Sequence, residues 1–235
     1  MSGIKYNLTR LRGIVVAIDG PAGAGKSTTA RLVAERLGLS YLDTGAMYRA
    51  LTYVALQSDI APSDSNKLTA LAGRLKFEFE DRDGVNHLRV NGTDVTAEIR
   101  GPEVTAHVSE VSAHQGVREA IVHKQRQLGM NGSVVAEGRD TTTVVFPHAD
   151  VKIYLEASLG ERARRRLLDL ARMGVSTNVD EQEKQLKHRD THDSSRAHSP
   201  LKKAKGAHVI DTTNLTITQQ VDAIVALVLS VVRQS

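Results

Sequence analysis

The sequence predicts an α/β protein, in which helices flank a parallel β-sheet and one small antiparallel insert interrupts the order. An apolar, β-branched stretch at 13–19 leads through a glycine-rich loop into helical spacing at 26–37. A second strand and helix repeat this order over 39–55, and such alternation of strands and helices is typical of a parallel sheet. Alternating apolar and charged residues from Leu75 to Glu80 instead predict antiparallel strands.

Turn, cap and spacing signals predict the remaining elements in chain order. The pairs Asp83-Gly84 and Asn91-Gly92 predict hairpin turns on either side of a short strand. The segments 158–161 and 216–219 have the residue order of a capping box, so each predicts the start of a helix. The other predicted elements are helices at 104–111, 117–128 and 180–190, and strands at 133–137, 151–155 and 208–211.

Composition excludes several kinds of chemistry. Because none of the 235 residues is cysteine, a disulfide framework, a thiolate metal site and a cysteine nucleophile are all ruled out. No segment approaches the roughly 18 unbroken apolar residues of a membrane span. Residues 1–12 lack the apolar core of a secretory signal, so we expect a cytoplasmic protein.

The charge balance bears on the kind of partner. A net charge of +4 suits a phosphorylated ligand or nucleic acid equally well. An aromatic content of 3% with no tryptophan disfavours a platform on which single-stranded bases could stack. We therefore expect small-molecule substrates and no nucleic acid, with the chain acting as a monomer.

A glycine-rich segment carries the clearest chemistry. Residues 20–27 match the P-loop pattern G-x-x-x-x-G-K-[ST] and lie between a predicted strand and a predicted helix. Backbone amides of such a loop surround phosphate oxygens, and the helix N-terminus adds partial positive charge. We expect Lys26 to reach the transferring phosphate and Ser27 to ligate Mg²⁺. The predicted ATP-binding residues are Gly20, Pro21, Ala22, Gly23, Ala24, Gly25, Lys26, Ser27 and Thr28.

Nucleotide binding alone leaves the reaction open, so other motifs have to narrow it. The sequence lacks the Asn/Thr-Lys-x-Asp motif with which GTPases read their base. The apolar strand at 134–137 runs into Gly138-Arg139-Asp140, whereas motors and helicases have paired acids at the end of such a strand. An arginine at this point suits a second anion beside the ATP phosphates.

Several motifs in a fixed order resemble one family. From the P-loop to Ser199-Pro200-Leu201, nearly the whole chain is similar to bacterial-type cytidylate kinases of the P-loop nucleoside monophosphate kinase superfamily. The landmarks between them are Asp43-Thr44-Gly45-Ala46-Met47-Tyr48-Arg49, Val117-Arg118-Glu119-Ala120, Gly138-Arg139-Asp140, Arg189-Asp190, Asp193, Arg196 and Val209-Ile210-Asp211. The resemblance implies a parallel five-stranded core at 1–62 and 98–235, a lid at about 158–178, and an antiparallel β insert at 63–97.

The resemblance also implies an activity, which is Mg²⁺-assisted transfer of the γ-phosphoryl group of ATP to CMP or dCMP. Arg49 and Arg139 would hold the CMP phosphate, and Thr44 would belong to the same site. Ser109, Arg118, Asp140 and Arg196 would surround the cytosine, while Arg189 and Asp193 would face the ribose. Offsets of four and three residues also place Arg189, Asp193 and Arg196 on one face of a helix.

The predicted chemistry needs no catalytic base, because the acceptor phosphate is already ionised at neutral pH. Positioning and charge neutralisation are then sufficient. We expect Asp19 to support Mg²⁺ from its outer shell. Arg162, Arg165 and Arg166 share a helix face on the lid. The residues predicted to act on the transferring phosphoryl are Lys26, Arg139, Arg165 and Arg166.

One loop departs from the family pattern, and two other functions stay open. After Gly138-Arg139-Asp140 the family has an apolar residue and then glycine, but here Thr142 replaces the glycine. Because a β-branched residue disfavours positive φ, we expect altered loop geometry if that glycine is needed. The alternatives are a kinase for another acceptor, such as UMP, AMP or a small metabolite, and an RNA-associated ATPase.

Overall fold

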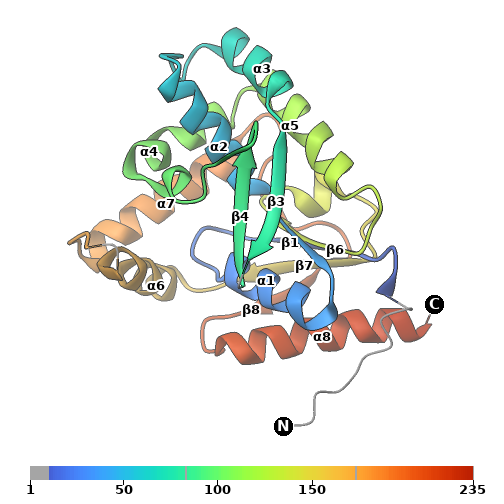
Figure 1. The fold of residues 1–235 in the computed structure, drawn as a ribbon. Helices are drawn as coiled ribbons and strands as arrows, with labels where there is room; N and C mark the ends of the chain where they lie inside the picture. Colours follow the sequence, from blue (N-terminus) through green and yellow to red (C-terminus); the bar gives the residue numbers. More distant parts are fainter. Residues whose placement is uncertain (1–10, 83, 173, 235) are drawn as a thin grey trace. The chain divides into compact units, whose positions relative to one another are not determined.

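The computed structural model describes residues 11–82, 84–172 and 174–234 (Figure 1). They form two compact units, one from the described parts of Met1–Tyr41 and Gly129–Ser235, the other from Leu42–Leu128. The predicted insert at 63–97 lies within the second unit, and its boundaries as a separate subdomain stay a prediction. Across the part of the chain that the structure describes, each helix is too short or too polar to cross a membrane.

A five-stranded sheet carries the P-loop and confirms the predicted α/β class. Its strand order is β2 (Ser40–Asp43), β6 (Val134–Gly138), β1 (Val15–Asp19), β7 (Val151–Glu156) and β8 (His208–Asp211). The central strand β1 pairs in parallel with β6 and β7, and β7 pairs in parallel with β8. The carboxyl ends of these strands therefore meet at one edge, where α/β proteins bind ligands.

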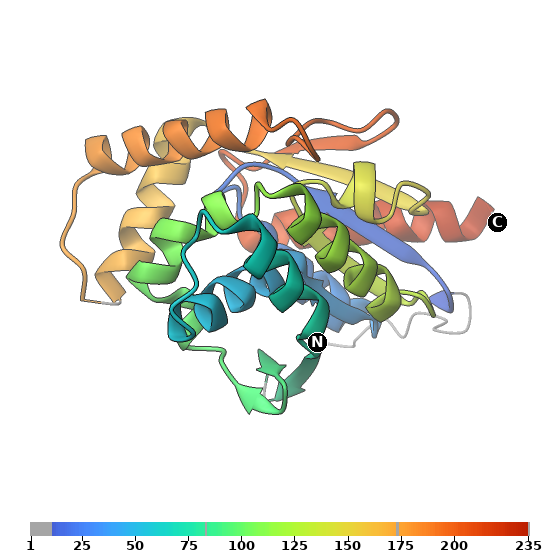
Figure 2. The same cartoon turned by 90° about the horizontal axis from the view of Figure 1, so that it is seen from above.

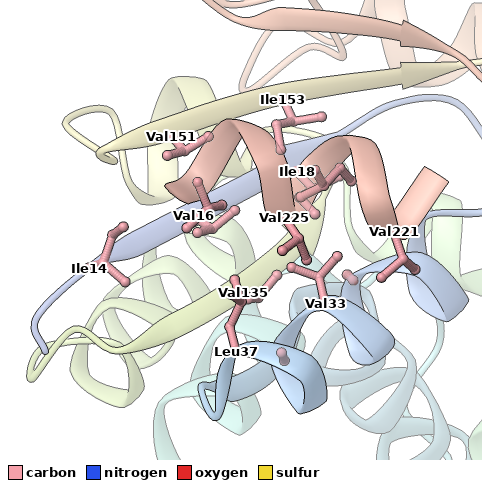
Figure 3. Close-up of a cluster of buried hydrophobic side chains, with 14 of the residues drawn as sticks. Ile14, Val16, Ile18, Val33, Leu37, Val135, Val151, Ile153, Val221 and Val225 are labelled. Atoms are coloured by element: carbon pink, nitrogen blue, oxygen red, sulfur yellow. The ribbon is translucent and has the colours of Figure 1, made fainter. Parts of the chain in front are cut away.

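The main apolar core lies between this sheet and the helices α1 (Lys26–Leu37) and α8 (Ile217–Gln234). Figure 3 shows strand side chains such as Val16 and Ile153 facing Val33 of α1 and Val221 of α8. All four are at most 1% exposed, and burying each contributes about 1.5–3 kcal/mol. The helix that begins at the P-loop is thus held against the sheet along its length.

The two predicted capping boxes differ in outcome. At α8 both bonds form, because Thr216 N donates to Gln219 Oε1 at 2.9 Å and Gln219 N donates to Thr216 Oγ1 at 3.3 Å. At α6 (Leu159–Arg172) only Glu161 N donates to Ser158 Oγ, so the reciprocal half of that prediction is wrong. The Glu161 carboxylate instead binds two arginines, which form stronger, charge-assisted bonds.

Helices α6 and α7 (Val179–Ser195) lie side by side (Figure 2). Ala163 of α6 and Leu186 of α7 pack against Ala22 of the P-loop, with Leu159 beside them. The predicted lid therefore contains α6 and contacts the P-loop through a small apolar cluster. Helix α7 extends the predicted polar helix at 180–190 by one residue at its start and by five residues, more than one turn, at its end.

The second unit combines helices with a small antiparallel sheet. Its helices are α2 (Thr44–Gln57), α3 (Ser65–Arg74), α4 (Pro102–Val111) and α5 (Gln115–Leu128), with a 3₁₀ turn at Glu98–Arg100. The sheet order is β3 (Phe77–Arg82), β4 (Val85–Val90) and β5 (Thr93–Asp94), which confirms the antiparallel strands.

Local signals explain the details of the second unit. Asn91 and Gly92 adopt the left-handed φ values of 51° and 85° that the predicted turn requires. Of the other predicted turn, Asp83 lies outside the described residues. The start of the predicted insert is a helix rather than a strand, because Asp64 caps α3 and α3 buries Leu68.

Candidate functional site

The P-loop joins β1 to α1 and depends on two of its glycines for its path. A Cβ on Gly20 would lie 2.0 Å from the carbonyl oxygen of Leu155, so a side chain cannot fit there. Gly25 is the N-cap of α1 with φ 88°, a conformation that other residues rarely adopt. No side chain caps the first turn of α1 in this described segment. The helix N-terminus is therefore suited to an anion.

Side-chain donors bind carbonyl oxygens of the P-loop. The bonds run from Lys26 Nζ to Pro21 O at 2.8 Å, from Arg162 Nη1 to Ala22 O at 3.1 Å, and from Thr212 Oγ1 to Ala24 O at 3.1 Å. Carbonyl oxygens repel phosphate, so binding them to other groups favours an anion in the loop.

Lys26 is buried among charges of both signs. Burial and the nearby Arg139 lower the pKa of its ammonium group to about 7, although Glu137 opposes this shift. The side chain is 5% exposed, and its ammonium donates to a backbone carbonyl rather than to a carboxylate. A phosphate brought to this point would favour the charged form of Lys26.

Glu137 is a candidate site residue that reasoning from the sequence did not assign. It lies on β6, is 4% exposed, and accepts a hydrogen bond from Ser27 Oγ at 2.6 Å. The hydroxyl of Tyr41 lies 3.3 Å from the same carboxylate oxygen. An apolar strand that ends in an acid is a signal that could have identified it, since P-loop proteins hold Mg²⁺ with an acid of this kind.

The donor set around Ser27 fits Mg²⁺. A hydroxyl and a carboxylate are hard oxygen ligands of the type that this ion prefers. Among the described residues, no group of three or more His, Asp or Glu side chains could hold a metal ion by itself. The remaining oxygens around the ion would therefore come from water and nucleotide phosphates.

The Asp19 carboxylate, which we expected to support Mg²⁺, is hydrogen-bonded to the segment that follows Asp140. One carboxylate oxygen accepts from Thr141 N at 2.8 Å, and the other accepts from Thr142 N at 2.7 Å and from the Thr142 hydroxyl. Burial raises the pKa of Asp19, and these hydrogen bonds only partly offset it. Both oxygens are thus engaged with the segment after Asp140, and the predicted outer-shell role toward Mg²⁺ stays a prediction.

Three arginines converge on Asp193 to form what we call the Asp193 cluster, made of Arg139, Arg189, Asp193 and Arg196. The nitrogen-to-carboxylate distances are 2.9 Å from Arg139, 4.0 Å from Arg189 and 2.6 Å from Arg196. Asp193 is 1% exposed, and burial raises its pKa, but the three guanidinium groups outweigh burial and hold the pKa below its ordinary value.

The cluster is assembled from separate parts of the first unit. Arg139 follows β6, whereas Arg189 and Asp193 lie on α7. Arg196 is the C-cap of α7 with φ −57° and ψ 137°, so it reaches Asp193 from just beyond the helix. Arg189, Asp193 and Arg196 thus lie close together, but the prediction that all three share one helix face is wrong for Arg196, which lies beyond the end of α7. Arg139 joins them from the end of β6. Asp140, the residue after Arg139, is 3% exposed.

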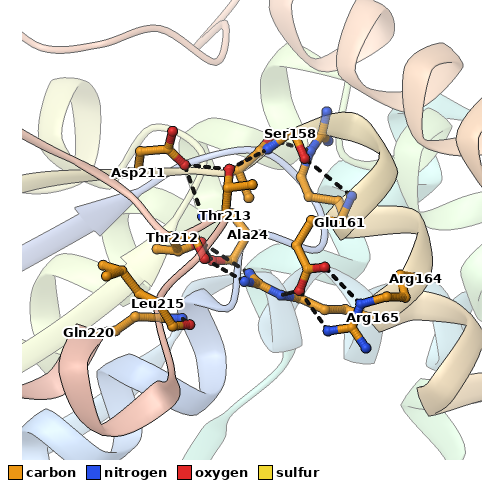
Figure 4. A network of polar contacts seen from close by, with 12 residues as sticks. Ala24, Ser158, Glu161, Arg164, Arg165, Asp211, Thr212, Thr213, Leu215 and Gln220 are labelled. Atoms are coloured by element: carbon orange, nitrogen blue, oxygen red, sulfur yellow. Dashed lines mark hydrogen bonds and ion pairs between the residues drawn. The ribbon is translucent and has the colours of Figure 1, made fainter.

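The lid arginines make unequal contacts. Arg165 binds Glu161 Oε1 at 2.8 Å, Thr212 Oγ1 at 3.0 Å and the Thr212 carbonyl oxygen at 2.6 Å (Figure 4). Arg162, which was not among the residues predicted to be catalytic, binds the P-loop and also Asp190 at 2.6 Å. Arg166 is half-buried on α6.

The other predicted CMP residues lie in the second unit. Thr44 is buried at the start of α2, and Ser109 is half-buried on α4. Arg49 donates to Thr105 Oγ1 at 3.0 Å and to the carbonyl oxygen of Ile99 at 3.3 Å. Arg118 is buried; it donates to Ser112 O at 3.0 Å, and its guanidinium lies 5.1 Å from the centre of the Tyr48 ring. The structure thus groups the predicted CMP residues in two sets, one in each unit.

Comparison with protein families and curated sequences gives close matches. A family model described as "Cytidylate kinase" matches residues 16–230. The "Cytidylate kinase" of Bacillus cytotoxicus is 46% identical over 92% of this chain and 96% of its own, and that of Geobacillus sp. (strain WCH70) is 48% identical with the same coverage. The "Bifunctional pantoate ligase/cytidylate kinase" of Prochlorococcus marinus (strain MIT 9313) is 46% identical over 95% of this chain. The chain spans only 45% of that bifunctional relative.

Solved structures show a related fold at low sequence identity. "Shikimate kinase from Acinetobacter baumannii in complex with shikimate" aligns with a TM-score of 0.50 at 16% identity, covering 95% of this chain and 97% of that one. At such an identity the likeness establishes the P-loop kinase fold alone.

Proposed function

Because the chain belongs to the cytidylate kinase family, we propose that it transfers the γ-phosphoryl group of ATP to CMP or dCMP, giving ADP and CDP or dCDP. The observation that carries the proposal is the P-loop, with its carbonyl oxygens bound and Lys26 buried, in the same unit as the arginine-rich Asp193 cluster. The P-loop suits a nucleoside triphosphate, and the Asp193 cluster provides fixed positive charge for a second anion.

The donor side follows from the P-loop contacts. Residues Gly20 to Thr28 bind the ATP phosphates through backbone amides and the N-terminus of α1. Lys26 stays close to the oxygens of the transferring phosphoryl group and neutralises the charge that they develop. Ser27, with Glu137 hydrogen-bonded behind it, would hold Mg²⁺, and the ion would supply further charge neutralisation on the phosphates.

The acceptor side draws on the guanidinium groups of the first unit. Arg139 holds the phosphate of CMP, since its planar fork can bind two phosphate oxygens at once. Asp193 fixes the direction of that fork through a 2.9 Å bond to Arg139 Nε. Arg189 and Asp193 face the ribose, and Asp140 and Arg196 read the cytosine edge. For Thr44, Arg49, Ser109 and Arg118, contact with CMP stays a prediction from the family resemblance.

The transfer itself needs alignment and charge rather than proton removal. The attacking oxygen belongs to an ionised phosphate, so the residues must hold it in line with the γ-phosphorus and shield negative charge. Arg165 and Arg166 contribute from the lid. Arg165 must exchange its two bonds to Thr212 for phosphate oxygens before it can act.

A substrate panel tests the proposal. Production of nucleoside diphosphate from ATP would be followed in a coupled assay with CMP, dCMP, UMP, AMP and GMP as acceptors. We expect CMP and dCMP to react best, with UMP a poor substrate at most. Preference for a purine would refute the cytidine assignment while leaving a P-loop kinase. A reaction without acceptor is the control, because ATP hydrolysis there, together with salt-sensitive RNA binding, would favour the RNA-associated ATPase.

The cytoplasmic location, the monomeric state and the absence of nucleic-acid partners stay predictions. Size-exclusion chromatography with light scattering would measure the state of association.

A further inference from the structure

The segment after Asp140 folds into a single π-helical turn, Thr141–Val145. The carbonyl oxygen of Asp140 accepts from the amides of Val144 at 2.8 Å and of Val145 at 3.2 Å, the second bond spanning five residues. Single π turns are rare and are often found at functional sites. This one begins directly after Arg139 and Asp140, two of the residues that we assign to CMP.

The turn is attached to β1 through one carboxylate. Asp19, the last residue of β1, directly precedes Gly20, and its carboxylate accepts the amides of Thr141 and Thr142 and the Thr142 hydroxyl. Asp19 and Thr142 are 0% and 1% exposed, so these bonds are shielded from bulk water. A buried carboxylate held by three donors is a rigid connection between the P-loop strand and the turn.

Thr142 adds a donor that the family pattern lacks. A glycine at this position would offer only its N–H to Asp19, whereas Thr142 offers a hydroxyl as well. Thr142 is not among the described non-glycine residues with positive φ, so the π turn does not require glycine here. The substitution therefore brings an extra bond without a backbone conformation that threonine disfavours.

We propose that the Thr142 hydroxyl is a positioning group, which binds Asp19 and thereby fixes the Arg139-Asp140 segment relative to the P-loop. The inference rests on the proposed function, since it concerns the alignment of acceptor and donor phosphates. Misalignment of reacting groups lowers the rate of transfer more than it lowers binding. Loss of the hydroxyl should therefore lower kcat more than it changes either KM.

Three variants and one matched control test the kinetics. Thr142→Val keeps the shape of the side chain without the hydroxyl, and Thr142→Gly reproduces the family pattern. Both should lower kcat for CMP about tenfold, with both KM values changed less than twofold. Thr142→Ser should restore kcat. Thr141→Val is the control, because the Thr141 hydroxyl is equally buried yet has no hydrogen-bond partner among the described residues.

Hydrogen exchange of the amides at 141 and 142 measures the attachment without relying on activity. We expect Thr142→Val and Thr142→Gly to speed exchange about tenfold relative to Thr141→Val and Thr142→Ser. The inference is overturned if Thr142→Val matches Thr141→Val in exchange, or if Thr142→Ser is as slow in turnover as Thr142→Val. If the unaltered protein does not phosphorylate CMP, the proposed function fails, and exchange alone then decides whether the hydroxyl holds the turn.

Discussion

The P-loop and the Asp193 cluster both hold positive charge, but they stabilise it in different ways. At the P-loop, Lys26 donates to a backbone carbonyl, and its pKa falls to about 7 because of burial and the nearby Arg139. In the Asp193 cluster, three guanidinium groups share one buried carboxylate, whose pKa they hold below its ordinary value.

This difference in how the charges are partnered predicts which substitutions lower activity and which lower stability. The charge of Lys26 is not balanced by a hydrogen-bonded carboxylate, so a bound phosphate would supply the partner and folding gains little from the ammonium group. The arginines of the cluster already share a carboxylate partner, so the fold depends on Asp193 even without substrate. We therefore expect substitution of Lys26 to remove activity and substitution of Asp193 to remove stability.

The largest expected effect is that of Lys26→Met on turnover. Methionine keeps the buried apolar stem but removes the charge from the transferring phosphoryl group, so kcat should fall about a thousandfold. The free energy of unfolding, measured with urea, should not decrease by more than about 1 kcal/mol. Lys205→Ala, at an exposed lysine, is the control. A Lys26→Met protein that is inactive only because it unfolds would contradict the distinction between Lys26, needed for activity, and Asp193, needed for stability.

Asp193→Asn should lower the free energy of unfolding by about 3 kcal/mol at pH 7, because it removes the charge of the buried carboxylate that three guanidinium groups share. The direction in which this contribution to stability changes with pH follows from the lowered pKa of Asp193. The stability that the carboxylate contributes is present above its ordinary pKa of 3.8 and is lost as pH falls through the lower folded value.

Urea unfolding at pH 7 and pH 3 would measure both effects. The difference in free energy of unfolding between Asp193→Asn and the unaltered protein should be smaller at pH 3 than at pH 7. Asp169→Asn, in an exposed pair with Arg172 on α6, is the control and should change neither value measurably. A gap that is equally large at both pH values would mean that the carboxylate charge is not what stabilises the cluster.

Arg196→Ala should weaken the binding of the acceptor CMP and leave the binding of the donor ATP unchanged. Loss of a charge-assisted bond costs about 1.5–3 kcal/mol, so the KM for CMP should rise by about 10- to 100-fold while the KM for ATP is unchanged. Steady-state kinetics with each substrate varied in turn gives both values. Intact CMP kinetics in this variant would show that the acceptor assignment is wrong.

The smallest effect is expected at Arg164. Its side chain is 59% exposed and pairs with Glu161, which also binds Arg165. Arg164→Ala should change kcat less than twofold, whereas Arg165→Ala on the same helix should lower kcat about tenfold. Equal losses in the two variants would indicate that total charge on the lid, rather than the placement of one guanidinium, controls turnover.

Features that depend on neighbours along the chain could be predicted from the sequence. The P-loop and the bounds of α1 follow from residues within one short segment, because glycine spacing and helical periodicity act locally. The same holds for the capping box of α8 and the turn at Asn91-Gly92. Motif order along the chain was enough to identify the family and the α/β class.

Features that depend on residues far apart in the chain were decided by the tertiary structure. Ser27 and Glu137 are separated by 110 residues, Arg139 and Asp193 by 54, and Asp19 and Thr142 by 123. No local pattern indicates which of several buried acids a given donor will meet. Packing of β6 and β7 against β1, and of α7 near the strand ends, brings these charges together, because burial leaves each of them in need of a partner.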